Sequence, residues 1–189
     1  MSDDLFTGRL VRLCPPNPDT DAEMIARWKD DSEYSRLEST DPALPWLARS
    51  VKAEMERAIQ EDRRYEFAFV IRTLADDRAI GFIDLDGIEW PHGDGWVGIG
   101  IGEREYWGKG YGTDAMEVLL RFAFVELNLH RVSLNVFEYN PRAIRSYEKV
   151  GFVAEGWIRQ ALLREGRRWD KLCMGILREE WEKRQRACD

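Results

Sequence analysis

The sequence predicts a mixed α/β fold of the α+β kind, with helices flanking a mostly antiparallel sheet. Apolar residues recur at helical spacing in the first third of the chain, alternate at strand spacing in the middle third, and switch between the two periods in the last third. A chain of 189 residues can bury a full core without disulfides or metal ions. No repeat, low-complexity stretch or Gly/Ser linker interrupts residues 1–189, so we predict a single domain.

The first elements are a short strand and two helices. Residues 10–13 form a strand candidate that ends before the turn Cys14-Pro15-Pro16. Residues 19–37 carry apolar side chains at helical spacing, among them Trp28, and predict one helix. A second helix is predicted from Trp46, after a proline-containing break.

The middle of the chain predicts an antiparallel meander. Its three segments are rich in β-branched and aromatic residues, and short turns separate them, one of them at Asp76-Asp77. The predicted strands are 65–73, 79–90 and 96–101.

The last third alternates strands and helices. Asn140 followed by Pro141 is typical of a helix start, and Gly151 is typical of a helix end. The predicted elements are a helix over 112–127, a strand over 131–137, a short helix from Pro141 to about Val150, and strands over 152–156 and 168–177.

The composition excludes several classes of protein. The net charge of -7 argues against nucleic-acid binding and against binding to anionic membranes, and it suits a cationic substrate. No apolar run approaches the roughly 20 residues that span a bilayer, and the acidic first residues do not resemble a signal peptide. Three widely spaced cysteines predict neither a disulfide framework nor a metal site, so we expect a reducing, cytoplasmic setting.

The strongest motif is Trp107-Gly108-Lys109-Gly110-Tyr111-Gly112-Thr113, which lies between a predicted strand and a predicted helix. Its alternate glycines let the backbone curl around a ligand, and the amides at a helix start attract phosphate or pyrophosphate. The spacing matches neither the P-loop nor the dinucleotide-binding fingerprint. The alternative interpretation is an ordinary flexible turn.

The preceding strand has one bare face, because Gly98, Gly100 and Gly102 alternate with Val97, Ile99 and Ile101. We expect either a slender ligand against the glycines or a bulge that leaves amides unpaired. The alternative is close packing of a helix or a bulky aromatic side chain on that face.

A third motif runs from Asn140 to Phe152. Ala143, Tyr147 and Val150 share one helical face, so Tyr147 is expected to be partly buried with its hydroxyl aimed in one direction. A buried tyrosine usually has a hydrogen-bond partner and no chemical role, so this motif alone does not indicate catalysis.

Together the three motifs resemble the GNAT superfamily of N-acetyltransferases, in particular its ribosomal-protein N-terminal and spermidine acetyltransferase branch. The family signature (Gln/Arg)-x-x-Gly-x-(Gly/Ala) is similar to the stretch from Trp107 to Gly112, with Trp107 in the first position. The second signature, Asn-x-x-Ala-x-x-x-Tyr-x-x-x-Gly-Phe, is matched from Asn140 to Phe152. The resemblance is strong over 98–156 and thin before Phe67.

The resemblance implies a sheet of about seven strands that splays between its fourth and fifth strands, and acetyl-CoA as the cofactor. The pyrophosphate would lie on the amides of Gly108 to Thr113, with the pantetheine arm along Gly100, Ile101 and Gly102. Asn140 would bind that arm or order the adjacent loop.

The expected reaction is direct attack of an amine on the acetyl thioester. The resemblance implies Tyr147 as general acid, and an unpaired amide near Ile101 is the expected donor to the developing oxyanion. The predicted fourth strand carries no acid, so Asp84, Asp86 and Glu89 on the preceding strand are the candidate bases, beside a water wire.

The sequence does not identify the acceptor amine. A polyamine, a protein N-terminal or lysine amine, and an aminoglycoside or other small amine all fit, and the branch favours a homodimer. Two rival interpretations are a non-catalytic acyl-CoA-binding sensor and a structural protein whose glycine strand packs against a partner.

Overall fold

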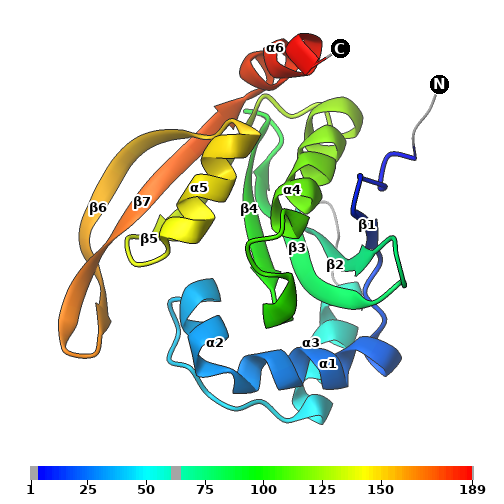
Figure 1. The fold of residues 1–189 in the computed structure, drawn as a ribbon, viewed down its shortest axis with the longest axis vertical. Coiled ribbons are helices and arrows are strands. Elements are labelled where there is room, and N and C mark those ends of the chain that lie inside the picture. Colours follow the sequence, from blue (N-terminus) through cyan, green and yellow to red (C-terminus); the bar gives the residue numbers. More distant parts are fainter. Residues whose placement is uncertain (1–3, 61–64, 189) are drawn as a thin grey trace.

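The computed structural model describes residues 4–60 and 65–188. At its centre lies a seven-stranded sheet with the order β1-β2-β3-β4-β5-β7-β6, which confirms the predicted mixed sheet (Figure 1). Neighbouring strands are antiparallel except β4 and β5, which are parallel. The strands are β1 (Val11–Cys14), β2 (Phe67–Thr73), β3 (Ala79–Glu89), β4 (Asp94–Ile101), β5 (Arg131–Phe137), β6 (Val153–Arg164) and β7 (Arg167–Leu177).

The helices form two groups around this sheet. In Figure 1, α1, α2 and α3 lie together at one end of the molecule, whereas α4 and α5 flank β4 and β5. The helical segments are α1 (Pro18–Asp30), α2 (Ser32–Glu38), α3 (Ala48–Gln60), the 3₁₀ turn η1 (Arg104–Tyr106), α4 (Tyr111–Arg121), its π-helical extension η2 (Phe122–Glu126), α5 (Pro141–Val150) and α6 (Arg178–Cys188).

Two predicted elements have other bounds in the structure, and one helix was not predicted. The single helix expected over 19–37 is two helices, because Asp31 turns out of the helical conformation and its carboxylate accepts the amides of Glu33 and Tyr34 to cap α2. The strand expected over 152–156 continues to Arg164 and pairs with β7 as a long hairpin. The helix α6, which is polar almost throughout, was not predicted.

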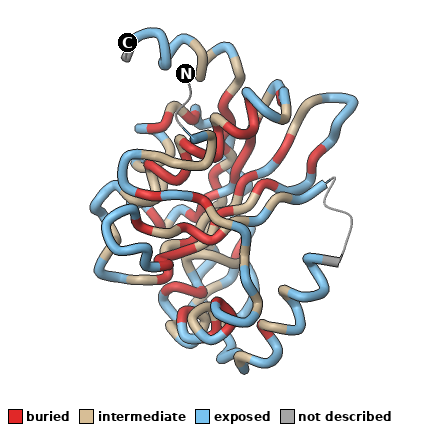
Figure 2. Tube along the Cα trace, turned by 90° about the vertical axis from the view of Figure 1, so that its right-hand side faces the viewer, coloured by how far each residue is buried: buried red, intermediate tan, exposed pale blue. Residues whose placement is uncertain are grey.

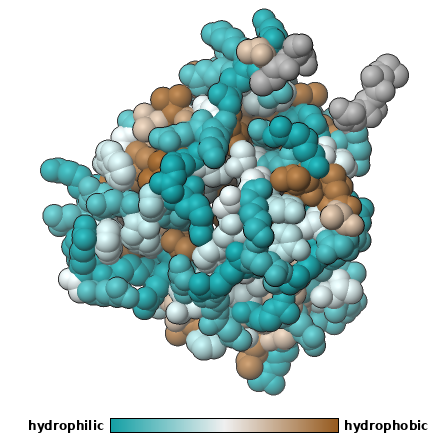
Figure 3. Space-filling model, viewed as in Figure 1, coloured by the Kyte–Doolittle hydropathy of each residue, from teal (hydrophilic) through white to brown (hydrophobic). Residues whose placement is uncertain are grey.

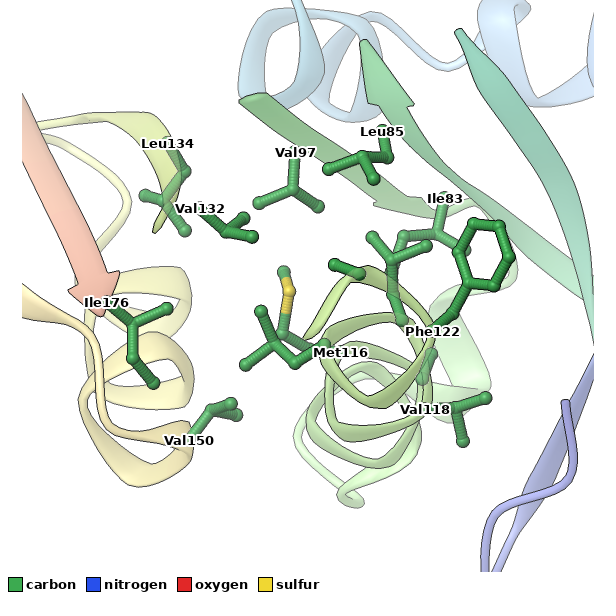
Figure 4. Packing of buried hydrophobic residues seen from close by; sticks show 14 of the residues in the cluster. Ile83, Leu85, Val97, Met116, Val118, Phe122, Val132, Leu134, Val150 and Ile176 are labelled. Carbon is green, nitrogen blue, oxygen red and sulfur yellow. The ribbon is translucent and has the colours of Figure 1, made fainter. Parts of the chain in front are cut away.

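The main core lies between the sheet and α4. Met116 of α4 is the centre of the cluster in Figure 4, where side chains from β3, β4 and β5 converge on it. Val97 and Leu85 approach from β4 and β3, and Val132 and Leu134 approach from β5. The buried segments accordingly run through the middle of the molecule, with exposed segments outside them (Figure 2).

The start of α4 also anchors the N-terminal segment. Asp114, only 3% exposed, accepts the backbone amides of Arg9, Leu10 and Val11 at 2.8–3.0 Å. A buried carboxylate with three such donors fixes the position of the helix relative to β1.

The surface is mainly hydrophilic in the view of Figure 3, with hydrophobic side chains in separate patches. In the described part of the chain, no helix has both the length and the apolar character needed to cross a membrane.

The glycine face of β4 provides a test of the packing. A Cβ on Gly102 would lie 2.1 Å from Cδ2 of Trp28, a side chain that is 3% exposed and held by Glu103 through its indole N–H. Gly102→Ala should therefore lower the free energy of unfolding by about 1–3 kcal/mol in a urea titration. Gly156→Ala is the matched control, because nothing lies within 4 Å of the added Cβ there. Equal stability of the two variants would contradict this packing.

Candidate active site

The site begins where β4 and β5 separate (Figure 1). Their pairing covers only Asp94–Trp96 of β4 against residues 131–133, and among the described strands none continues it beyond Trp96. The Gly102 amide donates to the carbonyl of Ile80 in β3 at 2.8 Å. Because successive strand residues direct their amides to opposite edges, the amides and carbonyls of Ile99 and Ile101 face the splay. The predicted splay is confirmed.

A cavity of about 310 Å³ opens at this splay. It is bounded by the free edge of β4, the loop before α4, the inner face of α5 and the end of α2. Its lining residues are Tyr34, Leu37, Glu38, Ile99, Gly100, Ile101, Tyr106, Trp107, Gly108, Gly110, Gly112, Thr113, Asn140, Arg142, Ala143, Arg145, Ser146, Tyr147 and Lys149.

The glycine loop presents backbone to the cavity at the start of α4. Gly108 and Gly110 have φ values of 72° and 91°. This left-handed backbone conformation is unfavourable for residues other than glycine. Nothing lies within 4 Å of a Cβ built on Gly108, and no side chain caps α4 at Gly110. This open, uncapped helix start has the geometry of an anion site.

Cations line the neighbouring wall. Arg142, Arg145 and Lys149 follow one another at spacings of three and four residues on α5, so they lie along one side of that helix. The Arg142 guanidinium stacks 3.9 Å from the centroid of the Trp107 ring. The Trp107 indole in turn donates to the carbonyl of Ile101 at 2.6 Å, so the first residue of the glycine motif connects α5 to the free edge of β4.

Tyr147 reaches the cavity from the middle of α5. The helix is capped by Asn140, whose side chain accepts the Ala143 amide at 3.2 Å, and it ends at Gly151 with φ of 113°. The ring contacts Phe152 in an edge-to-face arrangement. Burial raises the pKa of Tyr147 to about 12, so the phenol carries its proton at neutral pH.

Protein side chains fill the glycine face of β4. A Cβ on Gly98 would lie 2.8 Å from Asp84 Oδ1, and one on Gly100 would lie 2.5 Å from the Tyr34 hydroxyl. With Trp28 over Gly102, the expectation of a slender ligand against this face was wrong, and close packing of aromatic side chains explains the glycines. The open part of β4 is its edge.

Two carboxylates with raised pKa values lie near the glycine face of β4: Glu38 lines the cavity, whereas Asp84, next to Gly98, is outside its lining. Burial, with the charges of Asp86, Glu66 and Glu38, raises the pKa of Asp84 to about 7. Burial also raises the pKa of Glu38, although the Lys29 ammonium lies 4.0 Å from its carboxylate. At its raised pKa, the Asp84 carboxyl group exchanges a proton near neutral pH.

Three comparisons place these features in a known group. The family model for the acetyltransferase (GNAT) domain matches residues 11–153. The chain belongs to the GNAT acetyltransferase family. It is 31% identical over 153 residues to the SPbeta prophage-derived uncharacterized N-acetyltransferase YokL of Bacillus subtilis, covering 81% of this chain and 82% of that relative.

Two further GNAT relatives have named acceptors. Spermidine N(1)-acetyltransferase of Vibrio cholerae is 34% identical over 116 residues, which cover 61% of this chain and 66% of that protein. A crystal structure of spermidine N-acetyltransferase from Vibrio cholerae in complex with CoA and spermine superposes with a TM-score of 0.81 at 25% identity. That match covers 91% of this chain and 98% of the other.

The cavity of this GNAT protein contains most of the residues predicted from the sequence. Those in its lining are Gly100, Ile101, Trp107, Gly108, Gly110, Gly112, Thr113, Asn140 and Tyr147. Lys109 and Tyr111 belong to the same loop but are not in the lining, and Gly102 lies under Trp28 outside the cavity. Neither candidate base is in the lining: Asp84 lies next to Gly98, and Glu89 is exposed and pairs with Asp94 at the far end of β4.

The sequence reasoning missed the cationic side of α5 and the residues of α2 that line the cavity. The spacing of Arg142, Arg145 and Lys149 within the Asn140 motif was a usable signal for the first group. No comparable pattern marks Tyr34 and Glu38, because they join the cavity only through the tertiary contact of α2 with β4.

The raised pKa of Asp84 predicts a particular dependence of stability on pH. The folded-state pKa of about 7 lies above the ordinary 3.8, so the folded chain binds more protons and loses stability as pH rises from about 4 to about 7. Asp84→Asn removes this loss and should raise the free energy of unfolding at pH 8 by at most about 4 kcal/mol, with little gain at pH 4.

Urea unfolding at the two pH values measures this difference. Glu89→Gln is the control on the same strand, since Glu89 is exposed and is not among the charges that raise the pKa of Asp84. A gain from Asp84→Asn that is the same at pH 4 and pH 8 would refute the desolvated carboxylate.

Proposed function

We propose that the protein transfers the acetyl group of acetyl-CoA to the primary amine of a small cationic acceptor. The observation that carries this proposal is the free edge of β4, which lies in a cavity lined by the α5 cations Arg142, Arg145 and Lys149 and by the Glu38 carboxylate of α2. The cavity therefore offers cations to an anionic donor and a carboxylate to a cationic acceptor. The solved relative with CoA and spermine supports the same assignment.

The residues fit acetyl-CoA. The amides at the start of α4, together with Arg142 and Arg145, would hold its phosphates, and the Ile99 and Ile101 edge would bind its extended arm. The cofactor supplies an acetyl group activated as a thioester.

The chain's own residues then accept and donate protons and stabilise the charge that develops during the transfer. An alkylamine has a pKa near that of lysine, about 10.4, so it arrives protonated and must lose a proton before it attacks. Asp84, ionised above pH of about 7, takes that proton directly or through water. The Ile101 amide donates to the acyl oxygen, and Tyr147, still protonated at neutral pH, gives a proton to the leaving sulfur. Glu89 is too distant along β3 to share these roles.

The proposal also includes a cellular setting, an oligomeric state and a second candidate acceptor. Cys14 and Cys173 are both free thiols, which supports a reducing, cytoplasmic setting. Trp157 and Ile158 on β6 are 51% and 47% exposed, which supports a homodimer that covers this strand. A protein N-terminal amine is the second candidate acceptor.

The proposal predicts a specific loss in Tyr147→Phe. Without the phenolic proton, thiolate departure is unassisted and turnover should fall by roughly 10²-fold. Thiol release with acetyl-CoA and spermidine measures turnover, and calorimetry should show unchanged acetyl-CoA affinity. Tyr65→Phe, outside the cavity, is the control. Near-wild-type turnover would refute the role of Tyr147, and acetyl-CoA binding without amine-dependent thiol release in the wild type would favour a non-catalytic sensor.

A further inference from the structure

Three polar residues, Tyr34, Glu38 and Asp84, lie near the glycine face of β4. Of these, the proposed acetyl transfer uses only Asp84. Tyr34 and Glu38 lie one helical turn apart on α2, and both line the cavity. Asp84 approaches the same strand face from β3, at Gly98, while Tyr34 approaches at Gly100. Glycines at these two positions provide the space that the phenol and the carboxylate occupy.

The Tyr34 hydroxyl is buried without a partner. The residue is 3% exposed, and among the described residues no atom forms a hydrogen bond with its hydroxyl. Buried hydroxyls in folded proteins are almost always bonded, so an unbonded one at a cavity wall indicates a missing partner. Tyr34 and Gly100 both line the cavity, and the hydroxyl oxygen lies 2.5 Å from the position of a Cβ built on Gly100, so the missing partner is a group that enters the cavity at Gly100.

The charges around this hydroxyl determine the chemistry of that partner. Glu38 has a side chain that is 22% exposed, with the Lys29 ammonium 4.0 Å from its carboxylate, and its charge acts on both Tyr34 and Asp84. The charges acting on Asp84 come from Asp86, Glu66 and Glu38, all of them carboxylates. A group that enters between these acids gains from each positive charge it carries.

We propose that Tyr34 and Glu38 select a diamine or polyamine acceptor, with the Tyr34 oxygen accepting a hydrogen bond from the reacting nitrogen and the Glu38 carboxylate pairing with a second ammonium. This inference rests on the proposed acetyl transfer. Asp84 removes a proton from the reacting nitrogen, whereas Tyr34 and Glu38 position it. Leu37, between them on α2, offers an apolar contact to the carbon chain that joins the two nitrogens.

The test compares a polyamine with a monoamine of similar alkyl length. Initial rates of thiol release are measured with spermidine and with n-butylamine for the full chain, Tyr34→Phe, Glu38→Gln and the control Glu23→Gln. Glu23 is an exposed acid on α1 and does not line the cavity. Thermal melting and calorimetric titration with acetyl-CoA are run on the same proteins.

Glu38→Gln should raise KM for spermidine by about tenfold and leave KM for n-butylamine within about twofold, since only spermidine brings a second charge to that carboxylate. Tyr34→Phe should raise KM for both amines by about tenfold without lowering the melting temperature, because the lost hydroxyl had no partner in the free protein. Acetyl-CoA affinity should not change in either variant. The control should behave like the wild type.

Two failures are distinguishable. If the wild type acetylates amines but the spermidine to n-butylamine KM ratio is the same in Glu38→Gln, the acceptor assignment is overturned while acetyl transfer stands. If the wild type releases no thiol, the proposed function fails. In that case, calorimetric titration of the CoA-saturated protein with spermidine tests the polyamine site independently of catalysis. Loss of spermidine binding in Glu38→Gln supports the site, and unchanged spermidine binding in that variant overturns it.

Discussion

The early end of the β4–β5 pairing is the constraint on which the rest of the structure depends. After Trp96 the two strands diverge, and β5 continues its pairing with β7 while β4 continues with β3. The amides of Ile99 and Ile101 are left facing a cavity, whereas the Ile101 carbonyl accepts the Trp107 indole N–H. Unpaired peptide groups are costly inside a protein, so this edge is stable only where water or a ligand with amide groups can reach it.

The two faces of β4 serve different purposes. Val97 and Ile99 pack toward α4 and hold the glycine loop at the end of the strand. The opposite face has no side chains, which lets Trp28 and Tyr34 bring the α1–α2 unit against the strand and lets Asp84 approach Gly98. The same glycines therefore create a desolvated pocket for a carboxylate, and that desolvation is what moves its pKa toward neutral.

Most of the fold was predictable because its elements carry local signals. The meander has alternating strands with turn residues between them, and α5 has a cap at Asn140 and a stop at Gly151. The glycine loop and Tyr147 were found because their spacing is a motif. Asp31 was missed as a helix boundary, because a capping carboxylate within a helical pattern resembles an ordinary surface acid. Tyr34 and Glu38 were missed because their relation to the cavity is purely tertiary, as is the covering of the glycine face.

Amide hydrogen exchange of β4, followed residue by residue by NMR with and without acetyl-CoA, tests the central claim most directly. In the free protein the amides of Ile99 and Ile101 should exchange quickly, whereas those of Gly100 and Gly102, which face β3, should be protected. Acetyl-CoA should slow exchange at Ile99 and Ile101 and change little at the two glycines. If Ile99 and Ile101 are protected in the free protein, or if acetyl-CoA leaves their exchange unchanged, the free edge of β4 is not the cofactor site.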